Sequence, residues 1–324
     1  MEKLIQRIFS IQNEDEFNRC ALEVFDFQYQ NTEVYREFVD TLKHPLPKHY
    51  SEIPFLPIQF FKSHKILSRN KEYQALFKSS GTGSGERSKH YVAETAIYEQ
   101  SFLPTFEKFA GKLDELIICA LLPSYVEQGE SSLVYMVDRL IKESKNELSG
   151  YYLEHLDHLV QTLHRAKETG KKTVLFGVSY ALLDLAELSP DLSNITVIET
   201  GGMKGRRKEM SKTELHKTLN KAFGTSYISS EYGMCELLSQ AYSDKDELFE
   251  FPAWMKFRLR EVNDPFGFNI TENKTGVVSI IDLANIYSCS FIETQDLGRD
   301  YSGKLRLMGR LDYSEVRGCN LLVD

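Results

Sequence analysis

The chain has 324 residues, 42% hydrophobic and 27% charged, so it can bury a substantial core and has the composition of a globular protein. Its formal net charge is -8 and its one dense basic run is residues 204–208, which disfavours extended binding to nucleic acid but not the binding of a small anion. It has no run of 18 apolar residues and no signal-peptide pattern, so we expect no membrane insertion and a cytoplasmic location.

The first 43 residues place apolar side chains at helical spacing, which predicts a helical N-terminal segment over residues 1–50. Four prolines between residues 45 and 57 then exclude one continuous helix, and residues 56–61 are predicted to form a short extended element. The five cysteines lie far apart without a Cys-x-x-Cys pair, so neither a disulfide framework nor a structural zinc site is expected. They are Cys20, Cys119, Cys235, Cys289 and Cys319.

Residues 51–250 alternate between short β-rich runs and longer helical ones, a pattern typical of a mixed or parallel sheet covered by helices. The predicted strands are 74–77, 115–121, 173–176, 195–199 and 225–228. The predicted helices are 94–109, 132–145, 153–168, 180–188 and 208–222. From 251 to 308 short strands and turns follow, at 254–260, 276–282 and 290–293, and indicate a smaller β-rich part packed on the same core.

A glycine-rich loop lies between two predicted strands and contains Ser79, Ser80, Gly81, Thr82, Gly83, Ser84 and Gly85. Glycines let backbone N–H groups approach a ligand, and hydroxyls add donors for phosphate oxygens, with Arg87 and Lys89 as basic residues nearby. A nucleoside triphosphate is the expected ligand. The loop lacks the Gly-Lys-Ser/Thr ending of a Walker A motif, and a flexible hairpin loop is the alternative.

Three later segments also suit a nucleotide. Gly201 and Gly202 follow an apolar strand, where ligands usually bind in open α/β sheets. The second segment offers an aromatic ring for a nucleobase and a carboxylate for Mg²⁺, at Glu231, Tyr232, Gly233 and Glu236. The third places Asp296 and Arg310 where they suit ribose hydroxyls. Taken singly, the first segment is equally compatible with a tight turn, the second is better read as a buried Tyr with a surface Glu, and the third as solvated turn residues.

In this order the segments resemble the core motifs of the adenylate-forming superfamily of acyl-CoA synthetases, luciferases and peptide-synthetase adenylation domains. The likeness covers roughly residues 55–320. It implies an α/β fold, the N-terminal core of these enzymes with mixed sheets covered by helices and a smaller β-rich C-terminal portion, and it implies ATP and Mg²⁺ as cofactors. In this reading Glu236 is the metal ligand, Asp296 binds ribose, and residues 309–324 are the remnant of a hinge. Cys235 stands where the family has threonine, and either Arg87 or Lys89 fills the basic position.

The motif at 55–63, the Ser-Ser-Gly-Thr loop and the terminal Gly-Arg-Leu-Asp segment are similar to LuxE-type acyl-protein synthetases. That likeness implies a single adenylation core over 1–324 that activates a carboxylic, in particular fatty, acid and carries it as a thioester on Cys319. A reductase or carrier protein would then accept the acyl group. A thiolate is a strong nucleophile toward an activated carbonyl. The alternatives are an acid:CoA ligase, or a catalytically silent nucleotide-binding scaffold, and for Cys319 a small apolar residue that closes the terminus.

Overall fold

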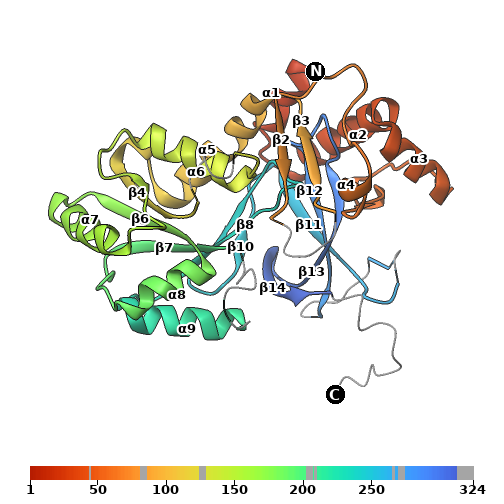
Figure 1. The fold of residues 1–324 in the computed structure, drawn as a ribbon. Helices are drawn as coiled ribbons and strands as arrows, with labels where there is room; N and C mark the ends of the chain where they lie inside the picture. Colours follow the sequence, from red (N-terminus) through yellow and green to blue (C-terminus); the bar gives the residue numbers. More distant parts are fainter. Residues whose placement is uncertain are drawn as a thin grey trace.

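The structure is a computed structural model and describes residues 1–43, 45–80, 86–123, 129–201, 207, 210–264, 267–268 and 274–311. Its main feature is a twelve-stranded sheet in the order β11-β12-β13-β14-β10-β9-β8-β7-β6-β4-β5, to which β1 (Leu56–Pro57) is added alongside β13. A separate two-stranded sheet, β2 (Ala75–Lys78) with β3 (Lys89–Val92), flanks the glycine-rich loop. Figure 1 shows this hairpin near the N-terminal helices, above the long sheet.

Three helices form the N-terminal segment: α1 (Glu2–Ile8), α2 (Glu14–Asn31) and α3 (Glu33–Leu42). The Asn13 side chain accepts a hydrogen bond from the backbone N–H of Glu16 and so caps α2. The predicted apolar face of α2, including Phe17 and Phe25, is buried. The helices expected in this segment are therefore present. The stretch predicted as extended at 56–61 differs, because the two-residue strand β1 is followed by the short helix α4 (Phe60–Ser63).

The left half of the sheet in Figure 1 is parallel. Its strands are β4 (Leu116–Leu121), β5 (Gly150–Tyr151), β6 (Lys172–Val178), β7 (Ile195–Thr200) and β8 (Ser229–Tyr232). Helices α5 (Thr95–Ala110) and α6 (Ser132–Ser144) cover one face, and α8 (Ser179–Glu187) and α9 (Lys212–Phe223) cover the other, with α7 (Leu156–Thr169) beside β6. The predicted strand at 225–228 is wrong, since β8 begins only at Ser229.

The right half is antiparallel from β8 onward. It contains β9 (Ala241–Ser243), β10 (Phe249–Glu250), β11 (Met255–Arg260), β12 (Gly276–Asp282), β13 (Phe291–Tyr301) and β14 (Lys304–Arg310). Strand β13 extends eight residues beyond the predicted run at 290–293 and turns into β14 at Ser302 and Gly303, whose φ angles are +52° and +85°. This hairpin carries two of the predicted site residues, Asp296 and Arg310, on neighbouring strands.

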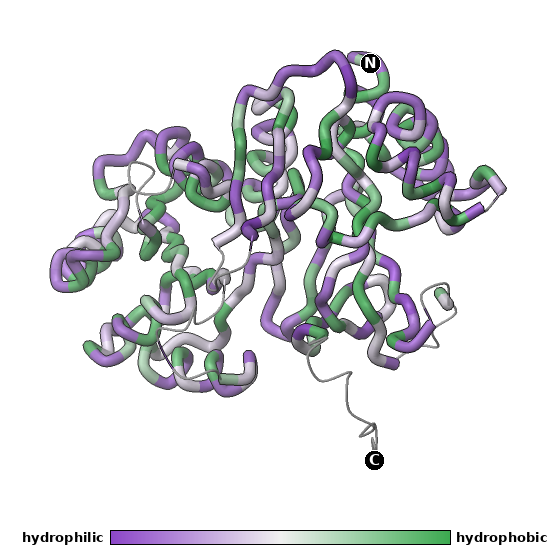
Figure 2. The backbone as a smooth tube through the Cα atoms, turned by 45° about the vertical axis from the view of Figure 1, so that its right-hand side comes forward, coloured by the Kyte–Doolittle hydropathy of each residue, from purple (hydrophilic) through white to green (hydrophobic). Residues whose placement is uncertain are grey.

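Hydrophobic residues concentrate in the strands and polar residues on the outer helix faces (Figure 2). Strand β4 has all six residues buried, as expected for a central parallel strand covered on both sides. Within the described ranges, no helix combines the length and apolar character needed to cross a membrane.

Candidate functional site

The carboxyl ends of β7 and β8 lie side by side and bring polar groups together. The Thr200 hydroxyl at the end of β7 donates to a carboxyl oxygen of Glu231 in β8 at 2.5 Å. Gly201 follows with a φ of +69°, a left-handed conformation that favours glycine and turns the chain away from the strand. The two segments predicted from sequence at 201 and at 231–233 therefore meet at one edge of the sheet, whereas Gly202 lies outside the described residues.

Glu231 is held in an unfavourable setting for its charge. Burial, together with the nearby carboxylate of Glu199, raises the pKa of Glu231 to about 7, while the Thr200 hydroxyl and Lys212 act in the opposite direction. Its carboxyl also folds over Gly233, where an added Cβ would lie 2.2 Å from a Glu231 oxygen. A side chain at position 233 would therefore displace this carboxyl.

We expect Glu231→Gln to stabilise the protein in alkaline solution and to leave its stability near pH 4.5 unchanged. Between about pH 4.5 and 7 the folded protein keeps a proton that the unfolded chain has lost, so the wild type loses stability as the pH rises through this range. The full shift corresponds to about 3 kcal/mol, and we expect roughly half because the side chain keeps some solvent contact. Urea unfolding at pH 5 and pH 8 measures this, and equal stabilities at pH 8 would contradict it.

The ends of the glycine-rich loop are tied to each other. The Ser79 backbone N–H donates to the Ser88 carbonyl at 3.1 Å, and the Ser88 N–H donates to the Ser79 hydroxyl oxygen at 3.0 Å. Arg87 donates to the Ser79 carbonyl, whereas Lys89 is exposed opposite Lys78. Ser80 is exposed at the start of the loop, whose predicted phosphate-binding residues Gly81, Thr82, Gly83, Ser84 and Gly85 lie outside the described residues.

Glu236 is buried, with 4% of its surface exposed, and lies next to the base of this loop. Burial raises the pKa of Glu236, although a hydrogen bond with the Ser88 side chain and the positive charge of Arg310 lower it in part. The carboxylate of Asp296 raises it further. Glu236 thus bonds to Ser88 and is close enough to Asp296 and Arg310 of the β13–β14 hairpin for their charges to shift its pKa.

Both carboxyl oxygens of Asp296 have partners. One accepts a hydrogen bond from the Tyr232 hydroxyl at 2.9 Å, and the other lies 3.2 Å from the Arg310 Nε. The Asp296 side chain is 13% exposed and the Arg310 side chain 71%. The Tyr232 ring packs against Phe249 and Phe251, so its predicted stacking on a nucleobase stays a prediction.

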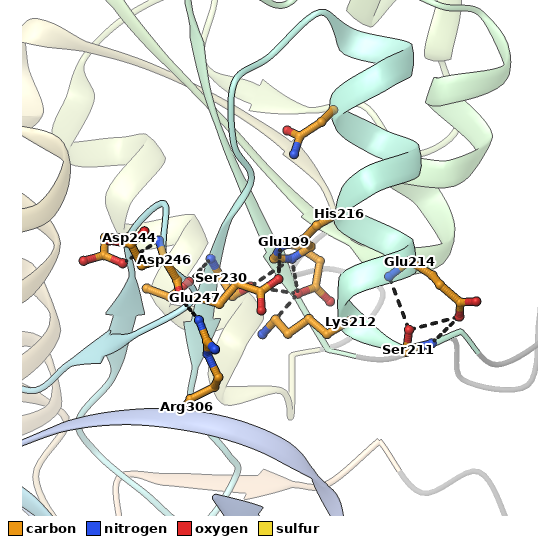
Figure 3. Close-up of polar contacts among 12 residues, drawn as sticks. Glu199, Ser211, Lys212, Glu214, His216, Ser230, Asp244, Asp246, Glu247 and Arg306 are labelled. Carbon is orange, nitrogen blue, oxygen red and sulfur yellow. Dashed lines mark hydrogen bonds and ion pairs between the residues drawn. The ribbon is translucent and has the colours of Figure 1, made fainter. Parts of the chain in front are cut away.

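A second polar cluster lies on the α9 face of β7 and β8 and was not predicted from the sequence (Figure 3). Glu199 accepts hydrogen bonds from Ser179 and Ser230, and lies 3.8 Å from Lys212 and 3.9 Å from His216. These contacts outweigh burial and lower the pKa of Glu199. The available local signal was the capping box of Ser211 and Glu214, which marks the start of α9 but not the partners of Lys212.

A cavity of about 550 Å³ lies elsewhere, between Phe9, α5 and β9, and none of the predicted nucleotide-binding residues lines it.

Among the residues that the structure describes, no group of three or more His, Cys, Asp or Glu side chains could enclose a metal ion. Mg²⁺ usually binds one or two carboxylates together with substrate phosphates, so the carboxyl of Glu236 suits the metal-binding role predicted for it, and this role stays a prediction. Cys319 lies outside the described residues.

Solved structures of acid-activating enzymes share this architecture. A crystal structure of 2-hydroxyisobutyryl-CoA ligase with 2-HIB-AMP and CoA matches 94% of this chain and 72% of that chain, with a TM-score of 0.62 and 12% identity. The structure of McyG A-PCP with phenylalanyl-adenylate matches 76% and 48%, with a TM-score of 0.52 and 16% identity. O-succinylbenzoate coenzyme A synthetase (MenE) from Bacillus subtilis, in complex with AMP, matches 72% and 49%, with a TM-score of 0.50 and 15% identity.

Sequence comparison adds no closer relative, because no family model and no curated protein matches the chain. At such low sequence identities the structural similarity shows a shared fold and nothing more. The predicted fold class, mixed α/β sheets covered by helices, is confirmed. The chain thus has the core fold of the adenylate-forming enzymes.

Proposed function

We propose that this protein uses ATP to activate a carboxylic acid as an acyl-adenylate. One observation carries the proposal: the base of the glycine-rich loop, the buried Glu236 and the Asp296–Arg310 pair lie in one place although they are far apart in the sequence. A nucleotide needs these three kinds of group together, namely donors for phosphate, a carboxylate for the metal, and a polar pair for ribose. The fold shared with the acid-activating enzymes supports the same reading.

In the proposed reaction, a carboxylate oxygen of the substrate attacks the α-phosphorus of ATP. A new C–O–P linkage forms while the bond between the α-phosphorus and the bridging oxygen breaks, and pyrophosphate leaves. Mg²⁺ bound by Glu236 would screen the phosphate charges. The protein's own part is positioning and charge stabilisation: Asp296 and Arg310 hold the ribose, Gly201 and Tyr232 lie on the adenine side, and Arg87 or Lys89 neutralises phosphate.

Trapping with hydroxylamine tests this step directly. The purified protein, incubated with ATP, Mg²⁺ and a panel of carboxylic acids of increasing chain length, should form an acyl hydroxamate with at least one acid. The chain-length profile then reports the substrate class, for which we propose a fatty acid. ATP binding without hydroxamate from any acid would instead indicate the catalytically silent scaffold.

For the second step we propose transfer of the acyl group to a thiol, as in LuxE-type acyl-protein synthetases. The thiolate sulfur attacks the acyl carbon, the thioester forms, and AMP leaves with the electron pair of the broken C–O bond. Cys319 is the proposed acceptor within the chain, with a reductase or carrier protein as the final partner in the cytoplasm. Transfer to CoA is the second candidate, because a structural neighbour is a CoA ligase solved with CoA.

We predict that Cys319→Ser abolishes covalent labelling of the protein by a radiolabelled acid and leaves hydroxamate formation intact, because only the thiol step requires the sulfur. Intact-protein mass spectrometry with and without neutral hydroxylamine measures the thioester. Cys20→Ser is the matched control, since Cys20 is a buried cysteine of the N-terminal helix α2. Full labelling of the Cys319→Ser variant would exclude this residue as the acyl carrier, and free acyl-CoA formed on addition of CoA would favour the ligase.

A further inference from the structure

The strand that leaves the glycine-rich loop carries a fully buried imidazole between two oxygen atoms. His90 is the second residue of β3 and has no exposed surface. Its Nδ1 lies 2.8 Å from the Cys235 carbonyl oxygen, and its Nε2 lies 2.9 Å from the Asn285 side-chain oxygen. One side chain thus contacts two segments that follow it by 145 and 195 residues.

Asn285 extends the connection to Glu236. Its amide nitrogen donates to the Glu236 carbonyl oxygen and to the Cys289 carbonyl oxygen, both at 2.8 Å. Carbonyl oxygens only accept, so the NH₂ group must face them, and the amide oxygen must therefore face His90. The orientation of the Asn285 side chain is fixed by its partners.

Both neutral tautomers of His90 connect β3 to the backbone at Glu236. Burial lowers the pKa of His90 to about 4, so the ring is neutral at pH 7 and has one N–H to donate. A proton on Nδ1 binds the carbonyl of Cys235, the residue before Glu236. A proton on Nε2 binds Asn285, which in turn holds the Glu236 carbonyl. Both routes tie β3 to the backbone at Glu236.

We propose that His90 and Asn285 are positioning residues, which hold the Glu236 carboxyl at the base of the glycine-rich loop. The proposal rests on the proposed function, because it takes Glu236 as the Mg²⁺ ligand. Ser88, the residue before β3, also bonds to the Glu236 side chain, so the carboxyl of Glu236 is held at the start of β3 and its carbonyl oxygen is held by Asn285. A shift of about 1 Å between phosphate-binding and metal-binding groups is enough to cost about 100-fold in rate.

Gln28 offers a matched control. It is fully buried, and its amide nitrogen donates to the Asn285 and Ile286 carbonyl oxygens, so it holds the same segment without contacting Glu236. Asn285→Leu and Gln28→Leu remove comparable buried amides. His90→Phe keeps the aromatic packing on Phe61 and removes the single N–H donor of the neutral ring, and His90→Gln restores a donor if the first variant folds poorly.

The test measures two quantities in each variant: hydrogen exchange of the peptide covering residues 233–238, and the Mg²⁺ concentration for half-maximal acid-dependent pyrophosphate exchange. We expect Asn285→Leu and His90→Phe to speed amide exchange in 233–238 and to raise the Mg²⁺ requirement by about 10-fold or more. Gln28→Leu should change neither beyond its effect on overall stability.

Equal effects of Asn285→Leu and Gln28→Leu on both quantities would overturn the proposal, because the contacts would then serve the fold alone. Unchanged exchange at 233–238 in Asn285→Leu and His90→Phe would overturn it too. A third result is a wild type that shows no pyrophosphate exchange with any acid while Asn285→Leu and His90→Phe still speed amide exchange in residues 233–238. That result would support the positioning contacts and contradict the proposed function.

Discussion

Glu236→Gln is expected to lower acid-dependent hydroxamate formation by at least about 100-fold without unfolding the protein. The substitution keeps the size of the side chain and a partner for Ser88, but it removes the one negative charge that we assign to Mg²⁺. Because burial already disfavours that charge, the neutral variant should be as stable as the wild type or slightly more stable. Loss of activity with retained stability separates a functional carboxylate from a structural one.

The measurement is hydroxamate formation over a range of Mg²⁺ concentrations, combined with thermal unfolding of each variant. Glu107→Gln is the control, since Glu107 is an exposed glutamate on α5 whose carboxylate accepts a hydrogen bond from the backbone N–H of Leu113. Wild-type activity in Glu236→Gln would remove Glu236 from the metal site. A parallel fall in activity in both variants would show a general effect of removing a carboxylate.

Glu199→Gln is expected to cost about 3–5 kcal/mol of unfolding free energy at pH 7. The Glu199 carboxylate accepts from two serines and faces Lys212 and His216 in a buried cluster, so its loss leaves Lys212 without its nearest anion. Burial lowers the pKa of Lys212 in spite of this neighbour, which means that the ammonium is held there only at a cost. The hydrogen bonds and cations around the Glu199 carboxylate are therefore the part of the cluster that stabilises the folded protein.

The same prediction has a pH dependence. The pKa of Glu199 is lower in the folded protein than in the unfolded chain, so its stabilisation is complete above about pH 4.5 and is lost as the pH falls through the folded pKa. The difference between wild type and variant should thus shrink in acid. Urea unfolding at pH 7 and below pH 4 measures it. The double variant Glu199→Gln/Lys212→Met should recover much of the loss, and a cost under about 1 kcal/mol in the single variant at pH 7 would contradict the account.

The helices and parallel strands could be predicted because their signals are local. Apolar periodicity defined α5, α6 and α9 to within a few residues, and the apolar run of β7 located the strand before Gly201. The far part of β13 was missed because Gln295 to Tyr301 is mostly polar and only its pairing with β12 and β14 makes it a strand. Residues 225–228 have β-forming side chains, but the chain there only links α9 to β8.

The order of the segments that form the proposed nucleotide site could be predicted from the sequence. Their arrangement in space could not. Glu236 and Asp296 are separated by 60 positions in the chain, and no local signal predicts that their charges influence each other. His90, Asn285 and Lys212 were missed for the same reason: each is an ordinary residue whose meaning comes from long-range partners. The one local hint at His90 is its inward position in the alternating strand β3, where a buried polar side chain needs a partner.

Pyrophosphate exchange into ATP is the measurement that bears most directly on acyl-adenylate formation. The purified chain, given ATP, Mg²⁺, labelled pyrophosphate and a carboxylic acid, should return label to ATP only when the acid is present, and Glu236→Gln should not. Label incorporation that is independent of any acid, or none with any acid despite measurable ATP binding, would contradict the account.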